Sequence, residues 1–451
     1  MTQGLMLKKA LTTLLLTFIG LNIGARDLNL TVDVQKLGLT PANTARTSAS
    51  TLYSRYEESS IATEFVRQLR AGNKLVEIPE VEAYIRQLGN KLSRHSGRSP
   101  KRFKFFVIND SKINAFAAAG GAIGIYKGLI LKAKSESELA GVLAHEIAHV
   151  SQHHLERTSE AVSDPGRMLT QALLVAIAVA AGSSQVSQAT IATARGTNMQ
   201  RLINYTRAHE KEADNIGINI MRAAGYNPQG MVDFMQRLLK MQRFSSSKIP
   251  SYLLTHPLTA DRVANAEQRA GKSAKGKKNS AAFLAIKAIL RQNPTAKDTK
   301  GLKLSASNIY TRLLNARRTE TKGNLGLAKK QYKAAYRQRP TNTAAIRRYA
   351  NILIRFKDLT TAQKVLDQAL KSHANNPQIN KLMAKLKAAQ GETAESYFWQ
   401  ANHDFLSGRT KLAIRQLNTA RSLARNDFYL SSRIDARTKE LKRIAKLEKR
   451  K

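Results

Sequence analysis

The first third of the chain alternates between helical and extended patterns of apolar residues. Apolar residues recur at helical spacing from about Ile61 to Leu69 and from about Glu80 to Ser96. Two runs rich in β-branched and aromatic residues follow, FKFFVI at 103–108 and AIGIYKGLI at 122–130, with a Gly120-Gly121 turn before the second. These patterns predict a small sheet packed against helices.

A capping signal precedes the most apolar helical pattern. Ser135 and Glu138 are spaced so that the serine can cap a helix whose first turn the glutamate closes. The run LAGVLAHEIAHVSQHHL follows directly and predicts a helix over 139–155. Further apolar periods predict helices at about 200–224 and 228–243.

The segment at 168–200 begins with MLTQALLVAIAVAAG and then becomes rich in Gly, Ser, Thr and Gln. Its apolar part is shorter than the roughly 20 residues that a membrane-spanning helix needs. We therefore expect a helix or hairpin that packs over the preceding domain as a lid. The alternative is an element that dips into a membrane surface.

After residue 270 the pattern changes to a repeat. GKSAKGKKNS at 271–280 reads as a linker, and 271–300 is expected to contain it together with a first helix. Beyond it, small and apolar residues recur after 34 residues, the tetratricopeptide period. We predict an α-solenoid at 301–451, with an unrelated helical bundle as the alternative. The registered positions are Ala316, Ala328, Tyr332 and Ala335, followed by Ala350, Ala362, Leu366 and Ala369.

A third copy of the pattern is out of register. Ala401, Ala413, Leu417 and Ala420 are displaced by 51 residues, which is one and a half repeats. The helix expected at about 377–390 is then an odd half-repeat, and we expect the array to bend or break there.

The N-terminus reads as a secretion signal. Lys8 and Lys9 precede the apolar run ALTTLLLTFIGLNIGA, which ends in small residues at Ala25. This pattern predicts a cleaved signal peptide at 1–25, with an uncleaved membrane anchor as the alternative. The polar, Ser/Thr-rich stretch at 26–60 is expected to be an extended arm.

Charge and cysteine content limit which partners the protein can bind and which side chains can form its functional site. The 451 residues carry 74 Lys and Arg against 32 Asp and Glu, a formal net charge of +42. Residues 271–451 hold 41 Lys and Arg against 11 Asp and Glu, a net of +30, so the excess lies in the predicted repeats and favours anionic surroundings. The chain has no cysteine, which excludes disulfides, thiolate zinc fingers and cysteine nucleophiles. Any metal must be bound by histidine and carboxylate.

The sequence HEIAH at 145–149 places two histidines one helical turn apart. His145 and His149 are about 40° apart around a helix axis and about 6 Å apart along it, so both rings can reach one ion. Glu146 leaves the same surface beside them. This is the spacing of zinc peptidases, and a helix with surface histidines is the alternative for this motif alone.

The next two histidines are not expected to bind that ion. His153 lies about 12 Å along the helix from His145, too far for one tetrahedral site, and His154 is predicted to point away. A pattern with a third histidine on this segment would need glycine and histidine where the sequence has Gln152 and Leu155. The third ligand must come from elsewhere.

The sequence HEKEAD at 209–214 offers the missing ligand. Glu210 and Asp214 share a face of the predicted helix, so one can bind a metal while the other accepts a hydrogen bond from a ligand imidazole. Glu212 lies on another face and is expected to be solvated. An ordinary charged helix face is the alternative, and the upstream HExxH motif argues against it.

HEIAH together with the ExxAD of HEKEAD resembles the gluzincin peptidases, which include the CAAX prenyl proteases and the HtpX-type membrane proteases. INAFAAAGG at 113–121, LLTHPLTADR at 253–262, the signal peptide and the repeats extend the resemblance over nearly the whole chain. The combination is similar to periplasmic members of this family. The implied fold is mainly α with a small β-sheet, with a metallopeptidase domain at 61–270 followed by a tetratricopeptide α-solenoid.

The resemblance implies roles for five residues near the two motifs. His145, His149 and Glu210 would bind one zinc ion per chain. Glu146 would be the general base of peptide hydrolysis, and Asp214 would be a second acid behind the ligands or a proton donor.

It also implies a regulatory ligand and a substrate-aligning edge. His256, in THPLT, would be a fourth ligand that covers the zinc and keeps the enzyme inactive. The strand region that would align an extended substrate by β-augmentation contains Asn114, Ala115, Gly120 and Gly121.

The implied function is that of a periplasmic zinc endopeptidase acting in the assembly and quality control of outer-membrane β-barrel proteins, and degrading misassembled forms. The repeats would dock substrates or the β-barrel assembly machinery, with the protein peripheral to the outer membrane. The alternative is a chaperone or scaffold whose peptidase is latent and gated by His256. A nucleic-acid binder is disfavoured because the chain has a secretion signal and no nucleic-acid motif. Anionic lipid or lipopolysaccharide fits the basic repeats better.

Overall fold

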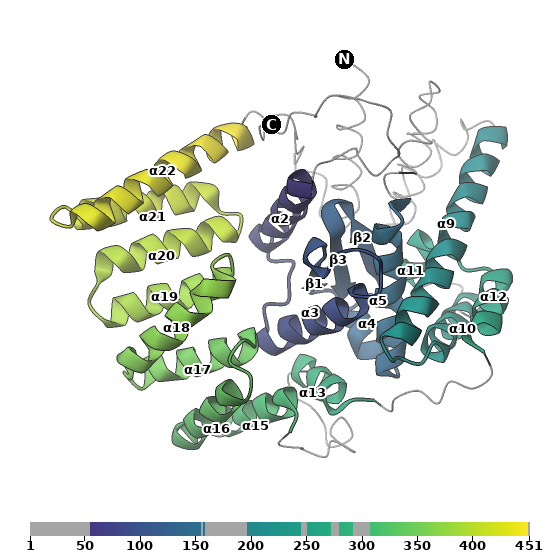
Figure 1. Ribbon diagram of the computed structural model, residues 1–451, viewed down its shortest axis with the longest axis horizontal. Helices are drawn as coiled ribbons and strands as arrows, with labels where there is room; N and C mark the ends of the chain where they lie inside the picture. The colour runs from purple at the N-terminus through teal and green to yellow at the C-terminus, as the bar shows by residue number, and fades with distance from the viewer. Residues whose placement is uncertain are drawn as a thin grey trace. The chain divides into compact units, whose positions relative to one another are not determined.

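The computed structural model describes residues 55–154, 157, 196–244, 250–271, 279–291 and 307–449 (Figure 1). The chain divides into two units, and Glu64–Ile85 and Ser280–Arg450 make up the second of them. The first unit takes the rest of the described chain, including Arg86–Asn279. The predicted signal peptide, nearly all of the N-terminal arm, and the predicted lid up to residue 195 lie outside the described residues.

The fold is mainly helical with one small sheet, as predicted. The sheet belongs to the first unit and has the order β1-β3-β2, with β1 parallel and β2 antiparallel to β3. Within the described residues, β2 therefore lies at an edge of the sheet. The strands are β1 (Lys104–Ile108), β2 (Ala115–Ala118) and β3 (Ala122–Tyr126).

The strand expected at 122–130 is shorter than predicted. After Tyr126 the chain turns into the short helix α4 (Lys127–Lys132), and the Gly128 N–H donates a hydrogen bond to the Asp110 carbonyl at 2.9 Å. Leu129 and Ile130 are fully buried in this helix. A short apolar run buried on all sides looks alike as strand or helix in the sequence, which explains the error.

The helix that the sequence predicted from its N-terminal cap is α5 (Glu136–Ser151), which lies in the first unit. The Ser135 hydroxyl accepts a hydrogen bond from the Glu138 N–H at 3.1 Å, and the Glu138 carboxylate accepts one from the Lys134 N–H at 2.7 Å. α5 packs against β2, α9 and α10, and nearly all of its residues are buried. The other helices are α9 (Gly196–Ala223), α10 (Gln229–Phe244), α11 (Ser251–Thr255) and α12 (Ala260–Ala270).

No helix among the described residues has both the length and the apolar character needed to cross a membrane.

The second unit is a stack of helices joined by turns of three or four residues from α15 onward (Figure 1). It also contains the C-terminal part of α2 (Arg55–Ala71), the first part of α3 (Pro79–Ser93) and α13 (Ala281–Leu290). The stacked helices are α15 (Ile309–Thr321), α16 (Leu325–Gln338), α17 (Thr343–Arg355), α18 (Leu359–His373), α19 (Pro377–Ala389), α20 (Thr393–Leu406), α21 (Thr410–Leu423) and α22 (Phe428–Lys449).

The repeat register is confirmed, but α19 does not break the stack. The alanines that carry the period are buried where paired helices meet. α19 begins 34 residues after α17 and 33 before α21, and it follows α18 through a turn of the usual length. The out-of-register pattern arises because the small residues Ala401 and Ala413 lie in α20 and α21, both fully buried there. The spacing of the helices along the sequence stays constant, but the third set of small residues falls on the pair α20 and α21.

The segment Glu64–Ile85 packs with the second unit, although the sequence placed 61–270 in one domain. A buried ion cluster explains this. The fully buried Glu80 carboxylate accepts hydrogen bonds from Arg348 Nε at 2.7 Å and from Arg317 Nη1 at 3.3 Å. Burial by itself would raise the pKa of Glu80, but the two arginines lower it. Pairs more than 200 residues apart leave no signal in local periodicity.

We expect Glu80→Ala to lower the free energy of unfolding by about 3 kcal/mol, because it leaves two guanidinium groups without their buried carboxylate. This is the lower end of the range for such pairs, since Arg317 and Arg348 keep 28% and 23% of their side-chain exposure. Urea denaturation followed by circular dichroism measures the change. Glu440→Ala, which removes a glutamate with 46% side-chain exposure, is the control and should cost less than about 1 kcal/mol. Equal losses in the two variants would contradict the role of the cluster.

Candidate metal centre

The candidate site lies where α5, α9 and the chain after α11 meet. α5 carries His145, Glu146 and His149, as the helical spacing predicted, and α9 carries Glu210. The two helices approach closely at Gly217 of α9, where a Cβ atom would lie 3.2 Å from the backbone nitrogen of His145. A larger residue there would push α9 away from the site.

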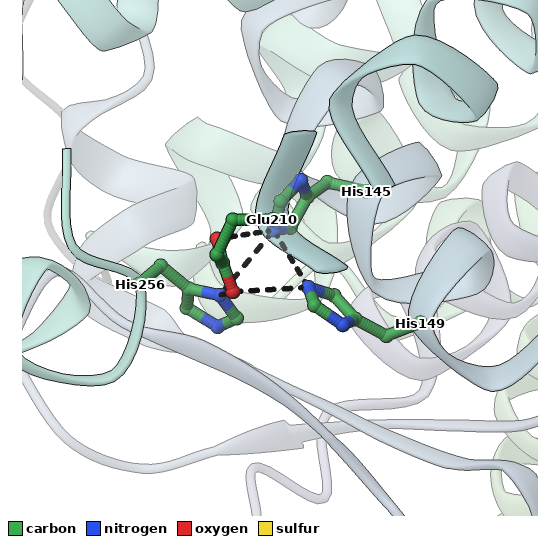
Figure 2. Close-up of side chains that lie close together, drawn as sticks. All are labelled: His145, His149, Glu210 and His256. Carbon is green, nitrogen blue, oxygen red and sulfur yellow. Dashed lines mark hydrogen bonds and ion pairs between the residues drawn. The ribbon is translucent and has the colours of Figure 1, made fainter. Parts of the chain in front are cut away.

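Four side chains point toward one another and bring four donor groups together, as Figure 2 shows. His145 Nε2 is 3.0 Å from His149 Nε2 and 3.3 Å from His256 Nδ1. Glu210 Oε2 lies 3.4 Å from His145 Nε2, and Glu210 Oε1 lies 3.4 Å from His149 Nε2 and 3.0 Å from His256 Nδ1. Helical spacing in the sequence predicted His145 and His149 as ligands, whereas the resemblance implied Glu210 and His256.

These separations match what a tetrahedral metal site requires. Two ligand atoms about 2.05 Å from one zinc ion at the tetrahedral angle are about 3.3 Å apart. The measured separations between 3.0 and 3.4 Å fit this value. Three imidazole nitrogens and one carboxylate are also a donor set that zinc accepts. All four donor atoms lie within 4.8 Å of one another, so the residues present fit such an ion.

The electrostatics of the donor set favour positive charge at its centre. Burial by itself would lower the pKa of His145, but hydrogen bonds to Asp214 and Glu210 raise it to about 10. Burial lowers the pKa of His149 to about 4, so this ring is neutral near pH 7 and has a free lone pair. Burial would raise the pKa of Glu210, but its interactions with His256 and with the Arg262 guanidinium hold that pKa well below its usual value.

Asp214 does not face the donor set but holds one of its ligands from behind. Its Oδ1 atom lies 2.9 Å from His145 Nδ1, so the carboxylate accepts the Nδ1–H bond and leaves Nε2 free to bind a metal. The residues alone had left open which acid of the ExxAD motif binds metal. The structure places Glu210 among the donors and Asp214 behind them.

Arg262 of α12 was missed by the sequence reasoning. Its guanidinium donates to both Asp214 oxygens, at 2.8 and 2.9 Å, and lies 2.8 Å from Glu210 Oε2. The only signal was its place in LLTHPLTADR, six residues after His256. A buried arginine beside two buried acids is understandable once the fold is known, because each acid needs a compensating charge.

Glu146 lies next to the donors without being one of them. It is fully buried, and burial raises its pKa. Its Oε1 atom is 3.4 Å from His256 Nε2. A hydrogen bond with the backbone of Ala117 in β2 acts against burial and lowers the pKa of Glu146. The edge strand β2 therefore runs beside the carboxylate. A buried carboxylate with a raised pKa is well suited to accept a proton near neutral pH.

The predicted substrate-aligning residues fall at the two ends of β2. Asn114 and Ala115 lie at its start, while Gly120 and Gly121 form the turn into β3 with φ values of 75° and 79°. α11 is tied to this region, because the Tyr252 N–H donates to the Ile113 carbonyl at 3.1 Å.

The Tyr252 ring stacks on His256, with ring centroids 4.6 Å apart. This second missed residue helps to hold His256 against the donor set.

His154 does not point away from the ligand pair, which corrects the sequence prediction, whereas Glu212 keeps 36% of its side-chain exposure. His154 is buried, and its Nδ1 lies 2.9 Å from Nδ1 of His149, while its Nε2 lies 3.1 Å from Glu212 Oε2. The prediction assumed that the helix continued to 155, but α5 ends at Ser151 and His153 has a φ of 56°. That left-handed residue turns the chain and brings His154 back to the site.

Two stretches of the chain match known protein families. Residues 79–270 match peptidase family M48, and residues 321–386 match the tetratricopeptide repeat. The chain is 29% identical over 443 residues to the Beta-barrel assembly-enhancing protease of Yersinia pestis, which covers 88% of this chain and 91% of that protein.

Two Escherichia coli (strain K12) proteins match shorter lengths of the chain. The Beta-barrel assembly-enhancing protease is 38% identical over 224 residues, or 50% of this chain and 46% of that protein. The chain thus aligns with about half the length of that relative. Metalloprotease LoiP is 28% identical over 185 residues, or 40% of this chain and 68% of that protein.

We expect Arg262→Met to lower the free energy of unfolding of the metal-free protein by about 3–5 kcal/mol, because two buried carboxylates lose their cation. The pKa of Asp214 is lowered in the folded protein, so its stabilising effect is present above its unfolded pKa and is lost as the pH falls. The cost of the substitution should therefore shrink on acidification below about pH 4.

Urea denaturation in the presence of a chelator, at pH 7 and at a pH below 4, measures both effects. Arg222→Met is the matched control, since Arg222 bonds only to exposed partners among the contacts seen here. A cost of Arg262→Met that does not change with pH would contradict the charge pairing.

Proposed function

We propose that the chain, in which residues 79–270 match peptidase family M48 and residues 321–386 match the tetratricopeptide repeat, is a zinc-dependent endopeptidase of the periplasm. One observation carries the proposal. The donor atoms of His145, His149, Glu210 and His256 are separated by distances that suit one tetrahedral zinc ion, beside the buried carboxylate of Glu146. The relatives named as metalloproteases support it.

A zinc ion held there would act as a Lewis acid on a peptide carbonyl and on a water molecule. Glu146 then takes the water proton, for which its raised pKa suits it, and can deliver that proton to the leaving amine. Asp214 keeps the Nδ1 proton on His145 and so keeps Nε2 turned toward the metal.

The edge strand β2 is the proposed binding edge for substrate. An extended polypeptide can add to it as a further strand between Asn114 and Gly121, with its backbone hydrogen bonds giving register without sequence specificity. Such a substrate would pass beside Glu146, because Ala117 of this strand lies near that carboxylate. Unpaired strands of unfolded or misassembled proteins fit this mode of recognition.

We propose misassembled outer-membrane β-barrel proteins as the substrates. Support comes from the relatives named Beta-barrel assembly-enhancing protease and from the secretion signal in the sequence. The repeats would dock substrates or the β-barrel assembly machinery. Their net charge of +30 over 271–451 also suits anionic lipid or lipopolysaccharide at the outer membrane.

Glu146→Gln tests the catalytic assignment. The amide cannot take a proton, so we expect cleavage of an unfolded β-barrel protein to fall by about 10²–10⁴-fold while zinc content is unchanged. Zinc is measured by elemental analysis and cleavage by gel electrophoresis. Glu267→Gln, at an exposed position in the same unit, is the control. Retained proteolysis in Glu146→Gln would refute the role of this residue.

A second candidate function, a chaperone or scaffold with a latent peptidase, is favoured by the position of His256. Its Nδ1 lies among the donors and its Nε2 lies 3.4 Å from Glu146 Oε1, so the ring stands where a water and a substrate carbonyl would have to enter. In this arrangement the peptidase stays closed until His256 moves.

We expect His256→Ala to raise basal cleavage by about tenfold, if the closed arrangement is favoured by about 1.4 kcal/mol. The initial rate of cleavage of an unstructured substrate such as casein measures the effect, with the exposed His95→Ala as the control. Unchanged cleavage would dismiss the latch, and decreased cleavage would instead make His256 a helper in the reaction.

A further inference from the structure

Behind His149 lies a second chain of polar groups that the mechanism above does not use. His154 follows the end of α5, and its side chain keeps only 3% of its exposure. Its Nδ1 atom contacts Nδ1 of His149 at 2.9 Å, and its Nε2 atom contacts Glu212 Oε2 of α9 at 3.1 Å. These contacts therefore link His149 on α5, through His154, to the Glu212 carboxylate on α9.

Two further groups hold this chain in place. The rings of His154 and His209 are stacked, with centroids 4.3 Å apart and an interplanar angle of 4°. Arg157 Nη1 lies 3.2 Å from Glu212 Oε2, the same oxygen that His154 contacts. Stacking on His209 thus holds the face of the His154 ring, and the contacts of its two nitrogens hold the ring edges.

The direction of the hydrogen bonds follows from the ligand role of His149. A neutral imidazole has one N–H donor and one acceptor nitrogen. Because Nε2 of His149 faces the other donors, its Nδ1 carries the hydrogen and donates to Nδ1 of His154. The hydrogen of His154 is then on Nε2, where it donates to Glu212.

We propose that His154 and Glu212 are positioning residues that hold His149 in the tautomer and orientation needed to bind the metal. This inference rests on the proposed function, since it assumes a metal among the four donors. Asp214 does the same for His145 through one direct contact at 2.9 Å. The second ligand imidazole reaches its carboxylate through an intervening histidine. Both metal-binding histidines of α5 are thereby oriented from α9.

Glu212 should contribute less than His154. Its side chain keeps 36% of its exposure, so water can replace part of its interaction, whereas His154 has no such access. Partners of this kind typically change metal affinity by about 10–100-fold when they are removed. We place His154 within that range and Glu212 at its lower end.

The test compares two substitutions at one position. His154→Phe keeps a flat ring to stack on His209 but removes the acceptor, and we expect zinc affinity to fall by about 10–100-fold. His154→Asn places an amide oxygen near the position of Nδ1 and should recover most of that affinity. Competition between the purified protein and a chromophoric zinc chelator measures the dissociation constant. His153→Asn is the control, because asparagine tolerates the left-handed φ of 56° at this position.

The melting temperature of the metal-free proteins separates positioning from general stability. If His154→Phe and His154→Asn melt alike without zinc but differ in affinity, the hydrogen bond to His149 is responsible. Equal affinities of wild type and His154→Phe would overturn the inference. If His154→Phe does not fold, Glu212→Gln is the deciding variant. We expect its zinc affinity to fall several-fold, and an unchanged affinity would contradict the proposed positioning role. Failure of the wild type to bind zinc would instead refute the proposed function.

Discussion

The close packing of α5 against α9 is the constraint on which the candidate site depends. Gly217 allows the two backbones to approach so closely that acids on α9 reach both nitrogens of one imidazole on α5. Glu210 meets His145 at Nε2 and Asp214 meets it at Nδ1, from positions one helical turn apart. A wider separation of the helices would break both contacts together. The helix pair therefore determines ligand identity and ligand orientation at once.

Burying this many ionisable groups is costly unless their charges are balanced. Arg262 balances Asp214 and Glu210, and its pKa is raised accordingly although burial alone would lower it. Glu146 has no such arginine and its pKa is raised. The same burial that makes it a poor anion makes it a good proton acceptor. The site thus contains one acid kept ionised for binding and another suited to proton transfer, which differ only in their neighbours.

Residues related by helical spacing were predictable, and residues related by turns were not. His145, Glu146 and His149 follow from one period, and the pairing of Glu210 with Asp214 follows from another. His154 was assigned wrongly because the sequence shows no helix end at Ser151, whereas His153 adopts a left-handed conformation that reverses the direction of the next side chain. The backbone angle of a single non-glycine residue cannot be read from apolar periodicity.

The sequence by itself determined the longer helices, the repeat register and the metal-binding motif, because each is set by contacts within a few turns of one segment. Tertiary structure alone decided that Glu64–Ile85 packs with the repeats and that Arg262 balances the site acids. These outcomes depend on buried charges whose partners lie far away in the sequence. Such a charge takes whichever partner the fold brings within reach, so only the packed chain reveals the pair.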